Sequence, residues 1–185
     1  MSLLPFCEWL AGTAWSIALH ESLYIYPFVE TTHVLGLILF VGSVTFVDLR
    51  LLGWVFRAVP VSEVTGRLLP WAVAGFVVVF ATGALLFYAI PVRTYLSIFF
   101  RIKVIVLIGA SLNMLLFHRH MNRSIVDWDH DRMPPFRARA TGAVSLLCWA
   151  TIIVMGRMIA YNWFDCDKPQ SDFVNWAAGC VLGTP

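Results

Sequence analysis

One long apolar run constrains this chain more than any other stretch of its sequence. It follows Glu30-Thr31-Thr32-His33, extends from Val34 to Val47, and ends at Asp48-Leu49-Arg50. Its only polar side chains are those of Ser43 and Thr45. A run of this length predicts a membrane-spanning helix, and an ionisable residue in such a helix is a functional-site hypothesis. His33 is therefore the first candidate site residue.

Composition places the whole chain in the same class. Of its 185 residues, 59% are hydrophobic and 13% are charged, and the mean hydropathy is +0.78. Soluble domains contain about 45–50% apolar and about 25% charged residues, so we expect an integral membrane protein in contact with the lipid bilayer. A net charge of +2 gives no support to a nucleic-acid partner. No Lys or Arg precedes Arg50, so we expect no cleavable signal peptide.

The apolar segments predict an all-α fold, a transmembrane four-helix bundle over residues 1–163. The predicted spans are residues 28–50, 70–90, 96–117 and 140–163. Each is close to the roughly 20 residues that cross a bilayer. Residues 3–22 are more polar and predict one short interfacial helix before the first span. The segments 51–69 and 121–138 are expected to be loops.

Basic residues are concentrated on one side of the predicted bundle. That side carries Arg50, Arg57, Arg67, Arg119, Arg123, Arg132, Arg137 and Arg139. The loops and tails of the other side carry only Arg93 and Lys168. The positive-inside rule therefore places both termini on the extracytoplasmic side of an inner membrane. All five tyrosines lie near that outer boundary, as expected for an aromatic belt.

The last 22 residues, 164–185, form an extracytoplasmic C-terminal tail that contains two cysteines. A disulfide between Cys166 and Cys180 is permitted on that side of the membrane. A pairing that involves Cys7, or free thiols, are the alternatives.

Residue spacing predicts two polar layers in the bundle. His33 and Asp48 are 15 residues apart, and so are Lys103 and His118, which is about 22 Å along a helix. The outer layer contains His33, Glu30, Arg101, Lys103 and Arg157. The inner layer contains Asp48 and Arg50, expected as a structural pair, with Asn113, His118 and His120.

Two explanations are open for the charges of the outer layer. A charged residue at the centre of a span costs roughly 2.5–3.5 kcal/mol, and snorkelling toward the boundary relieves that cost. The alternative is that an anionic or electron-rich ligand satisfies the cations. A haem propionate, a quinone oxygen and a lipid phosphate are the candidates.

Three roles are open for His33. It is a buried neutral side chain with a hydrogen bond to Thr32 or to a carbonyl group, a ligand of haem b or of a metal ion, or a quinone contact or proton relay. The second and fourth predicted spans contain no histidine. A second axial haem ligand would therefore be His20, Met155 or Met158.

The inner layer offers a second candidate metal site. His118 and His120 form a His-x-His motif, and the loop after them contains Asp127, Asp129 and Asp131. Such a set is able to bind a divalent metal ion. A merely solvated loop with alternating charge is the alternative.

Several motifs resemble a group of uncharacterised bacterial inner-membrane proteins. They are His33-Val-Leu-Gly36 through Gly42 to Asp48-Leu-Arg-Leu-Leu-Gly53, Phe100-Arg-Ile-Lys103 with Asn113 and His118, Ser145-Leu-Leu-Cys-Trp149, and Gly156-Arg157-Met-Ile-Ala-Tyr161. The resemblance covers most of residues 5–161 and implies a four-span inner-membrane protein. A weaker similarity, in span count and in a histidine followed by glycines, is to copper-resistance D-type proteins and small b-type membrane cytochromes.

We therefore expect an inner-membrane subunit in electron transfer that binds haem b or a quinone at the outer polar layer. His33 is the expected ligand or hydrogen-bond partner, and Lys103 and Arg157 are expected to neutralise carboxylates or a reduced quinone. Other membrane subunits or a periplasmic redox partner are the expected partners. Transport of copper or another small solute, and a structural anchor in a larger complex, are the alternatives. The sequence contains no motif of a hydrolase or a kinase.

Overall fold

Helices account for all the regular secondary structure in the part of the chain that the structure describes. The computed structural model describes residues 3–120, 125–161, 164, 166 and 169–180, except for the side chains of His120 and Val126. Four helices are long and apolar enough to cross a membrane: α3 (Ile25–Leu51), α4 (Val61–Ala89), α6 (Ile98–His120) and α8 (Phe136–Met158). The predicted all-α transmembrane four-helix bundle is thereby confirmed, and the chain is a multi-pass membrane protein.

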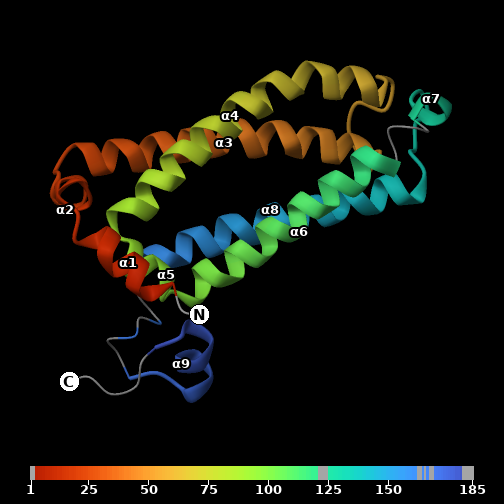
Figure 1. Ribbon diagram of the computed structural model, residues 1–185. Coiled ribbons are helices and arrows are strands. Elements are labelled where there is room, and N and C mark those ends of the chain that lie inside the picture. Colours follow the sequence, from red (N-terminus) through yellow and green to blue (C-terminus); the bar gives the residue numbers. More distant parts are fainter. Residues whose placement is uncertain (1–2, 121–124, 162–163, 165, 167–168, 181–185) are drawn as a thin grey trace.

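The four long helices form two pairs, α3 with α4 and α6 with α8 (Figure 1). The helix α3 packs along α4 and also against α8, which in turn packs along α6. Within the described residues, α4 and α6 are not closely packed against each other. The shorter helices are α1 (Leu4–Ala11), α2 (Ala14–Glu21), α5 (Pro91–Tyr95), α7 (Ile125–Trp128) and α9 (Asp172–Ala178). We call the end that carries α5, with α1, α2 and α9, the α5 end, and the opposite end the α7 end.

Glycines allow the long helices to approach closely. A Cβ atom at Gly75 in α4 would lie 2.6 Å from the backbone nitrogen of Phe40 in α3. A Cβ atom at Gly36 in α3 would meet side chains of α4 at 2.9 Å, and one at Gly142 in α8 would lie 2.9 Å from the carbonyl oxygen of Asp48. Membrane helices associate through such small residues because hydrophobic burial gives no driving force between helices in lipid.

The helix α4 begins at Val61, so the predicted loop over residues 51–69 is wrong in its second half. The first turns are polar, and they are supported by an ion pair of 2.5 Å between Glu63 and Arg67 one turn apart. Pro70, expected to open the span, lies inside the helix. It removes one backbone hydrogen bond, which spanning helices tolerate when neighbouring groups compensate.

The start of α4 is capped by the segment that precedes α8. The carboxylate of Asp129 accepts hydrogen bonds from the backbone N–H of Ser62 at 2.7 Å and from its hydroxyl at 2.5 Å. The backbone N–H of Val61 donates to the carbonyl of Asp129 at 3.2 Å. Partial burial alone would raise the pKa of Asp129, but the bonds from Ser62 and the nearby His130 hold it below its usual value. The ionised carboxylate also complements the dipole of α4.

A small water-excluded core closes the α7 end. It consists of Leu51, Val61, Trp128 and Ala138. Arg50 is fully buried, and it donates from Nε to the carbonyl of Val59 at 2.8 Å and from Nη2 to the carbonyl of Asp131 at 3.0 Å. The expected pair of Arg50 with Asp48 is wrong for the described residues, because the guanidinium instead joins two connecting segments.

The N-terminal segment forms two short helices, whereas the sequence predicts one interfacial helix over residues 3–22. The helix is interrupted at Gly12-Thr13, where the backbone of Thr13 is extended. The Thr13 hydroxyl accepts a hydrogen bond from the N–H of Ser16, which caps the start of α2. The hydroxyl of Ser16 donates to the carbonyl of Tyr88 at 2.7 Å, and the hydroxyls of Thr13 and Tyr88 lie 2.8 Å apart. These bonds fasten α2 to the end of α4.

The C-terminal tail is closed on itself by a disulfide and is fastened to the bundle by an arginine. Cys166 and Cys180 are joined, whereas Cys7 is buried and free, so the disulfide alternative is confirmed and the pairing with Cys7 is wrong. Arg101 of α6 donates from Nη1 to the carbonyl of Ala177 at 2.9 Å, at the C-terminal end of α9. A cation at this position complements the helix dipole.

We expect Gly75→Ala to destabilise the bundle, because the added methyl group would meet the backbone of Phe40. Overpacking of this kind costs about 1–3 kcal/mol, which should lower the midpoint of thermal unfolding in detergent by several degrees. Gly42→Ala is the matched control, since nothing lies within 4 Å of a Cβ atom at Gly42. Equal midpoints for the two variants would contradict the close α3–α4 crossing.

Candidate functional site

His33 lies about two turns inside the α5 end of α3, with its ring directed at α4. Its Nδ1 atom is 2.9 Å from the hydroxyl oxygen of Thr82, which is buried. That hydroxyl already donates its one hydrogen to the carbonyl of Val78 at 2.6 Å. Because the contact with the Val78 carbonyl is the shorter of the two, we assign the hydroxyl oxygen as the acceptor of Nδ1–H of His33. In the neutral ring this leaves the lone pair on Nε2.

Gly83 lies beside the Cε1–Nδ1 edge of the His33 ring. A Cβ atom at Gly83 would lie 3.3 Å from Cε1 of His33 and 3.8 Å from Nδ1. The contact with Gly83 and the hydrogen bond with Thr82 together hold the ring against α4. A side chain held in this way is pre-organised to use Nε2 as an acceptor or as a ligand.

Lys103 enters the same level of the bundle from α6. Its Nζ atom lies 3.5 Å from the position of a Cβ atom at Gly156 in α8, and its side chain is half-buried. It is close enough to His33 for the two side chains to interact electrostatically. Within the described residues, Lys103 has neither an ion-pair nor a hydrogen-bond partner. We name the group of His33, Thr82, Gly83, Lys103 and Gly156 the His33–Lys103 site.

The His33–Lys103 site offers two complementary functions to a ligand. The Nε2 atom of His33 is a hydrogen-bond acceptor or a metal ligand, and the ammonium group of Lys103 is a charged donor. Both lie roughly 8–12 Å from the ends of their helices at 1.5 Å per residue. The site is therefore suited to an electron-rich group that enters from the α5 end or from the bilayer.

The other two cations of the predicted outer layer are directed elsewhere. Arg101 reaches the C-terminal tail and lies 5.2 Å from the centre of the Tyr95 ring. Arg157 is exposed, and its guanidinium carbon lies 5.2 Å from the centre of the Tyr161 ring. Because Gly156 faces Lys103, the next residue along α8 is rotated by about 100° from that direction. The structure thus brings together His33 and Lys103, and not Arg157.

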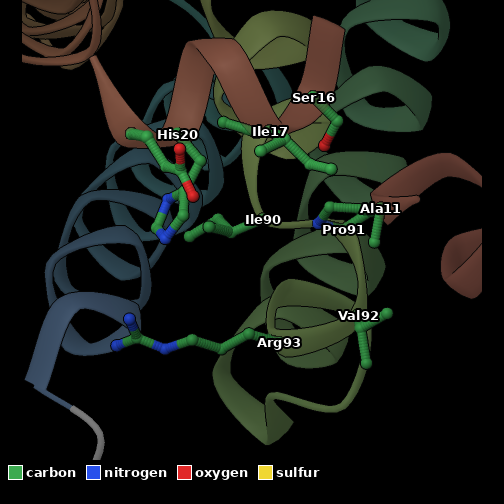
Figure 2. A pocket seen from close by; sticks show the side chains of 10 residues that line it. Ala11, Ser16, Ile17, His20, Ile90, Pro91, Val92 and Arg93 are labelled. Carbon is green, nitrogen blue, oxygen red and sulfur yellow. The ribbon is translucent and has the colours of Figure 1, made fainter. Parts of the chain in front are cut away.

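The candidate second haem ligands have different positions. His20 is exposed on α2, and its ring meets the ring of Tyr26 edge-on at 6.2 Å. Tyr26 is seven residues before His33, about 10 Å along α3. His20 lines a cavity at the α5 end that Figure 2 shows. Met155 and Met158 are half-buried on α8, next to the level of Gly156, and their role as ligands stays a prediction.

The inner layer is partly assembled at the α3–α8 contact. Asp48 is buried there, its carboxyl interacts with the hydroxyl of Ser145, and its Oδ2 atom has no partner in the described part of the protein. Asn113 donates to the carbonyl of Thr141 at 3.1 Å.

The predicted inner metal pair is only half described. His118 is exposed near the end of α6, and the side chain of His120 lies outside the described residues. No group of three potential metal ligands occurs among the residues that are described. The metal role of His118 and His120 stays a prediction.

Sequence reasoning missed Thr82, Gly83 and Gly156 in the His33–Lys103 site. Counting residues from the helix ends would have indicated them, because α4 and α8 run opposite to α3. Thr82 lies seven residues before the end of α4, and His33 lies eight residues after the start of α3. A hydroxyl residue or a glycine that lies as far from the end of an antiparallel helix as His33 lies from the start of α3 is thus a candidate contact of His33.

We expect Thr82→Val to release the His33 ring, because it removes the acceptor of Nδ1–H. In the wild-type protein, ¹⁵N NMR of the His33 ring should show a protonated Nδ1 and an unprotonated Nε2. In Thr82→Val the two tautomers should exchange. Thr151→Val is the control, since the Thr151 hydroxyl bonds its own helix as Thr82 does, to the carbonyl of Leu147 at 2.8 Å. A protonated Nε2 in the wild-type protein would refute the assigned tautomer.

Comparison with known proteins yields one match, to a family. No curated protein matches the chain, and no solved structure does. The family model that matches is described as a family of unknown function, DUF6644, and it aligns with residues 8–162. That segment contains all four long helices and both members of the His33–Lys103 pair. The chain belongs to this family, DUF6644.

Proposed function

We propose that the protein is an inner-membrane subunit in electron transfer that binds a quinone or quinol headgroup at the His33–Lys103 site. The observation that carries this proposal is the ammonium group of Lys103 in a membrane-spanning helix, unpaired within the part of the chain that the structure describes. This ammonium group lies near Gly156 of α8, within electrostatic range of His33, with no carboxylate partner among the described residues. A cation in a span is costly and marks a functional site by default. A ligand oxygen would compensate the cation where the protein does not.

The chemistry of the two side chains matches the two redox forms of a quinone. The lone pair on Nε2 of His33 is an acceptor for the O–H group of a hydroquinone. The ammonium of Lys103 is a donor to a carbonyl or phenolate oxygen. The same imidazole is able to hold the proton that leaves a hydroquinone, since histidine changes its charge near neutral pH.

The glycines at the His33–Lys103 site let its two polar side chains lie close to the neighbouring helices. Gly83 and Gly156 present backbone rather than side chains toward His33 and Lys103. Ligand sites in bundles are built from side chains on facing helices, and His33 and Lys103 come from different helices. The apolar residues around the site would exclude water and strengthen both polar contacts.

A second candidate ligand, haem b, is supported by the orientation of His33. Histidines that bind a metal usually donate the other ring N–H to a fixed acceptor, and Thr82 provides that acceptor for Nδ1. His33 would then hold the haem iron through Nε2, with Met155 or Met158 of α8 as a second protein ligand. A bound haem would supply one-electron chemistry, and Lys103 would neutralise a propionate.

The proposed orientation places both termini outside the cytoplasm. The excess of arginines at the α7 end supports it through the positive-inside rule. The disulfide between Cys166 and Cys180 supports it independently, because such bonds persist in oxidising compartments such as the periplasm. The His33–Lys103 site then lies in the outer half of the membrane, where a periplasmic redox partner has access.

We expect decylubiquinone to bind the purified protein, and His33→Ala and Lys103→Met to weaken that binding. Loss of a hydrogen bond with a charged group costs about 1.5–3 kcal/mol, so Lys103→Met should raise the Kd tenfold or more. Arg119→Gln is the control, because Arg119 lies on the same helix near the α7 end. Fluorescence quenching of the tryptophans measures the affinity.

An optical spectrum of the same sample, before and after dithionite, separates the two ligands. A Soret band that is lost in His33→Ala would assign haem b. Equal quinone affinity in all variants, without a Soret band, would refute the electron-transfer proposal. Bound copper that depends on His33 would then indicate transport. Altered assembly without any ligand would indicate a structural anchor.

A further inference from the structure

A second site lies at the α5 end, separate from the His33–Lys103 site. It is a cavity of about 360 Å³ where α2 crosses the junction between α4 and α5 (Figure 2). Its volume is in the range of about 300–1,000 Å³ that is typical of small-ligand pockets. The α3 residue Tyr26 is next to it, with its ring edge-on to His20 and in electrostatic contact with Arg93.

The walls of this cavity are held in place by buried groups. Ser16 is 2% exposed, and its hydroxyl bonds the carbonyl of Tyr88 at the end of α4. Pro91 is fully buried at the first position of α5, and Thr94 is buried one turn later. Because α2 is fastened on one side and α5 is packed on the other, the cavity is a built feature of the fold.

Its lining combines apolar walls with a charged rim. The apolar walls are Ala11, Ile17, Ala89, Ile90 and Val92. The rim carries His20, Glu21 and Arg93. In Figure 2 the side chains of His20 and Arg93 extend to the same side of the cavity, with Ile90 between them. The rim therefore presents a guanidinium, an imidazole and a carboxylate above an apolar interior.

The cavity opens at the expected boundary between lipid and water. The spanning helix α4 ends at Ala89, in the cavity wall. On α2 and in the turn that follows it, the side chains of Trp15, Leu23 and Tyr24 are 81%, 83% and 85% exposed. Aromatic residues with apolar neighbours are enriched at the level of lipid headgroups, and short apolar helices lie in that plane.

We propose that this cavity binds the headgroup of an aminophospholipid, which carries a phosphate beside a primary ammonium. Arg93 and His20 would contact the phosphate, and Glu21 would contact the ammonium. A guanidinium has five N–H donors, so Arg93 is able to bind a phosphate in addition to its other contacts. The glycerol and the first methylene groups of the chains would cover the apolar walls. This proposal does not depend on the proposed function of the His33–Lys103 site.

The charges of the rim favour an aminophospholipid over other common headgroups. A phosphatidylglycerol headgroup has no cation, so it would leave the charge of Glu21 uncompensated. A phosphatidylcholine headgroup has a cation without N–H donors, so it makes no hydrogen bond with the carboxylate. Phosphatidylethanolamine satisfies both charged groups at once.

Native mass spectrometry of the full chain tests the proposal. The protein would be released from nanodiscs of equimolar phosphatidylethanolamine, phosphatidylcholine and phosphatidylglycerol, and the retained lipids counted. We expect enrichment of phosphatidylethanolamine on the wild-type protein. Arg93→Gln should reduce its retention on the order of tenfold, the loss expected for one charge-assisted hydrogen bond. Glu21→Gln should abolish the preference for phosphatidylethanolamine over phosphatidylcholine.

The double variant Glu63→Gln with Arg67→Gln is the control, because this exposed ion pair lies near the α7 end. It should retain lipid as the wild-type protein does, and circular dichroism should show the same helix content for all variants. Soluble glycerophosphoethanolamine should compete only weakly with the lipid, since it lacks the chains that cover the apolar walls. Retained lipid of bulk composition, or cavity variants that behave like the wild-type protein, would each overturn the proposal.

Discussion

The close crossing of α3 and α4 is the contact on which the rest of the structure depends. At Gly75 the backbone of α4 comes so close to Phe40 of α3 that a methyl group would not fit. Two turns away along α3, this proximity brings the ring of His33 within hydrogen-bond distance of Thr82 and into contact with Gly83. A wider crossing would leave His33 without an acceptor in a region where water cannot replace it.

The His33–Lys103 site has an unbalanced charge, and that imbalance is the reason to assign it a ligand. A lysine at a helix centre costs roughly 2.5–3.5 kcal/mol, and less toward the ends. The neighbouring His33 offers no negative charge, and Glu30, one turn before it on α3, is exposed. The two arginines of the predicted outer layer contact the tail or an aromatic ring. Lys103 is thus the one cation that remains at this level among the described residues, and we propose a ligand oxygen as its partner.

The fold was predictable from the sequence to a greater extent than the site. Apolar length alone indicates four spans, and counting residues from each end places His33 and Lys103 at one level. Rotation about the helix axis is harder to predict, because the spans are apolar on most sides. For that reason the sequence predicts Arg157 at the site, whereas in the structure it is Gly156 that faces Lys103. The helical start of α4 depends on a cap from Asp129, far away in the sequence, and no local pattern reveals such a contact.

We propose that an electron-rich group joins His33 to Lys103. A cryo-electron microscopy map of the protein in native lipid nanodiscs tests this proposal most directly. We expect non-protein density within hydrogen-bond distance of both Nε2 of His33 and Nζ of Lys103. A map in which Lys103 extends to the headgroup region, and in which Nε2 of His33 has only protein or water neighbours, would contradict it.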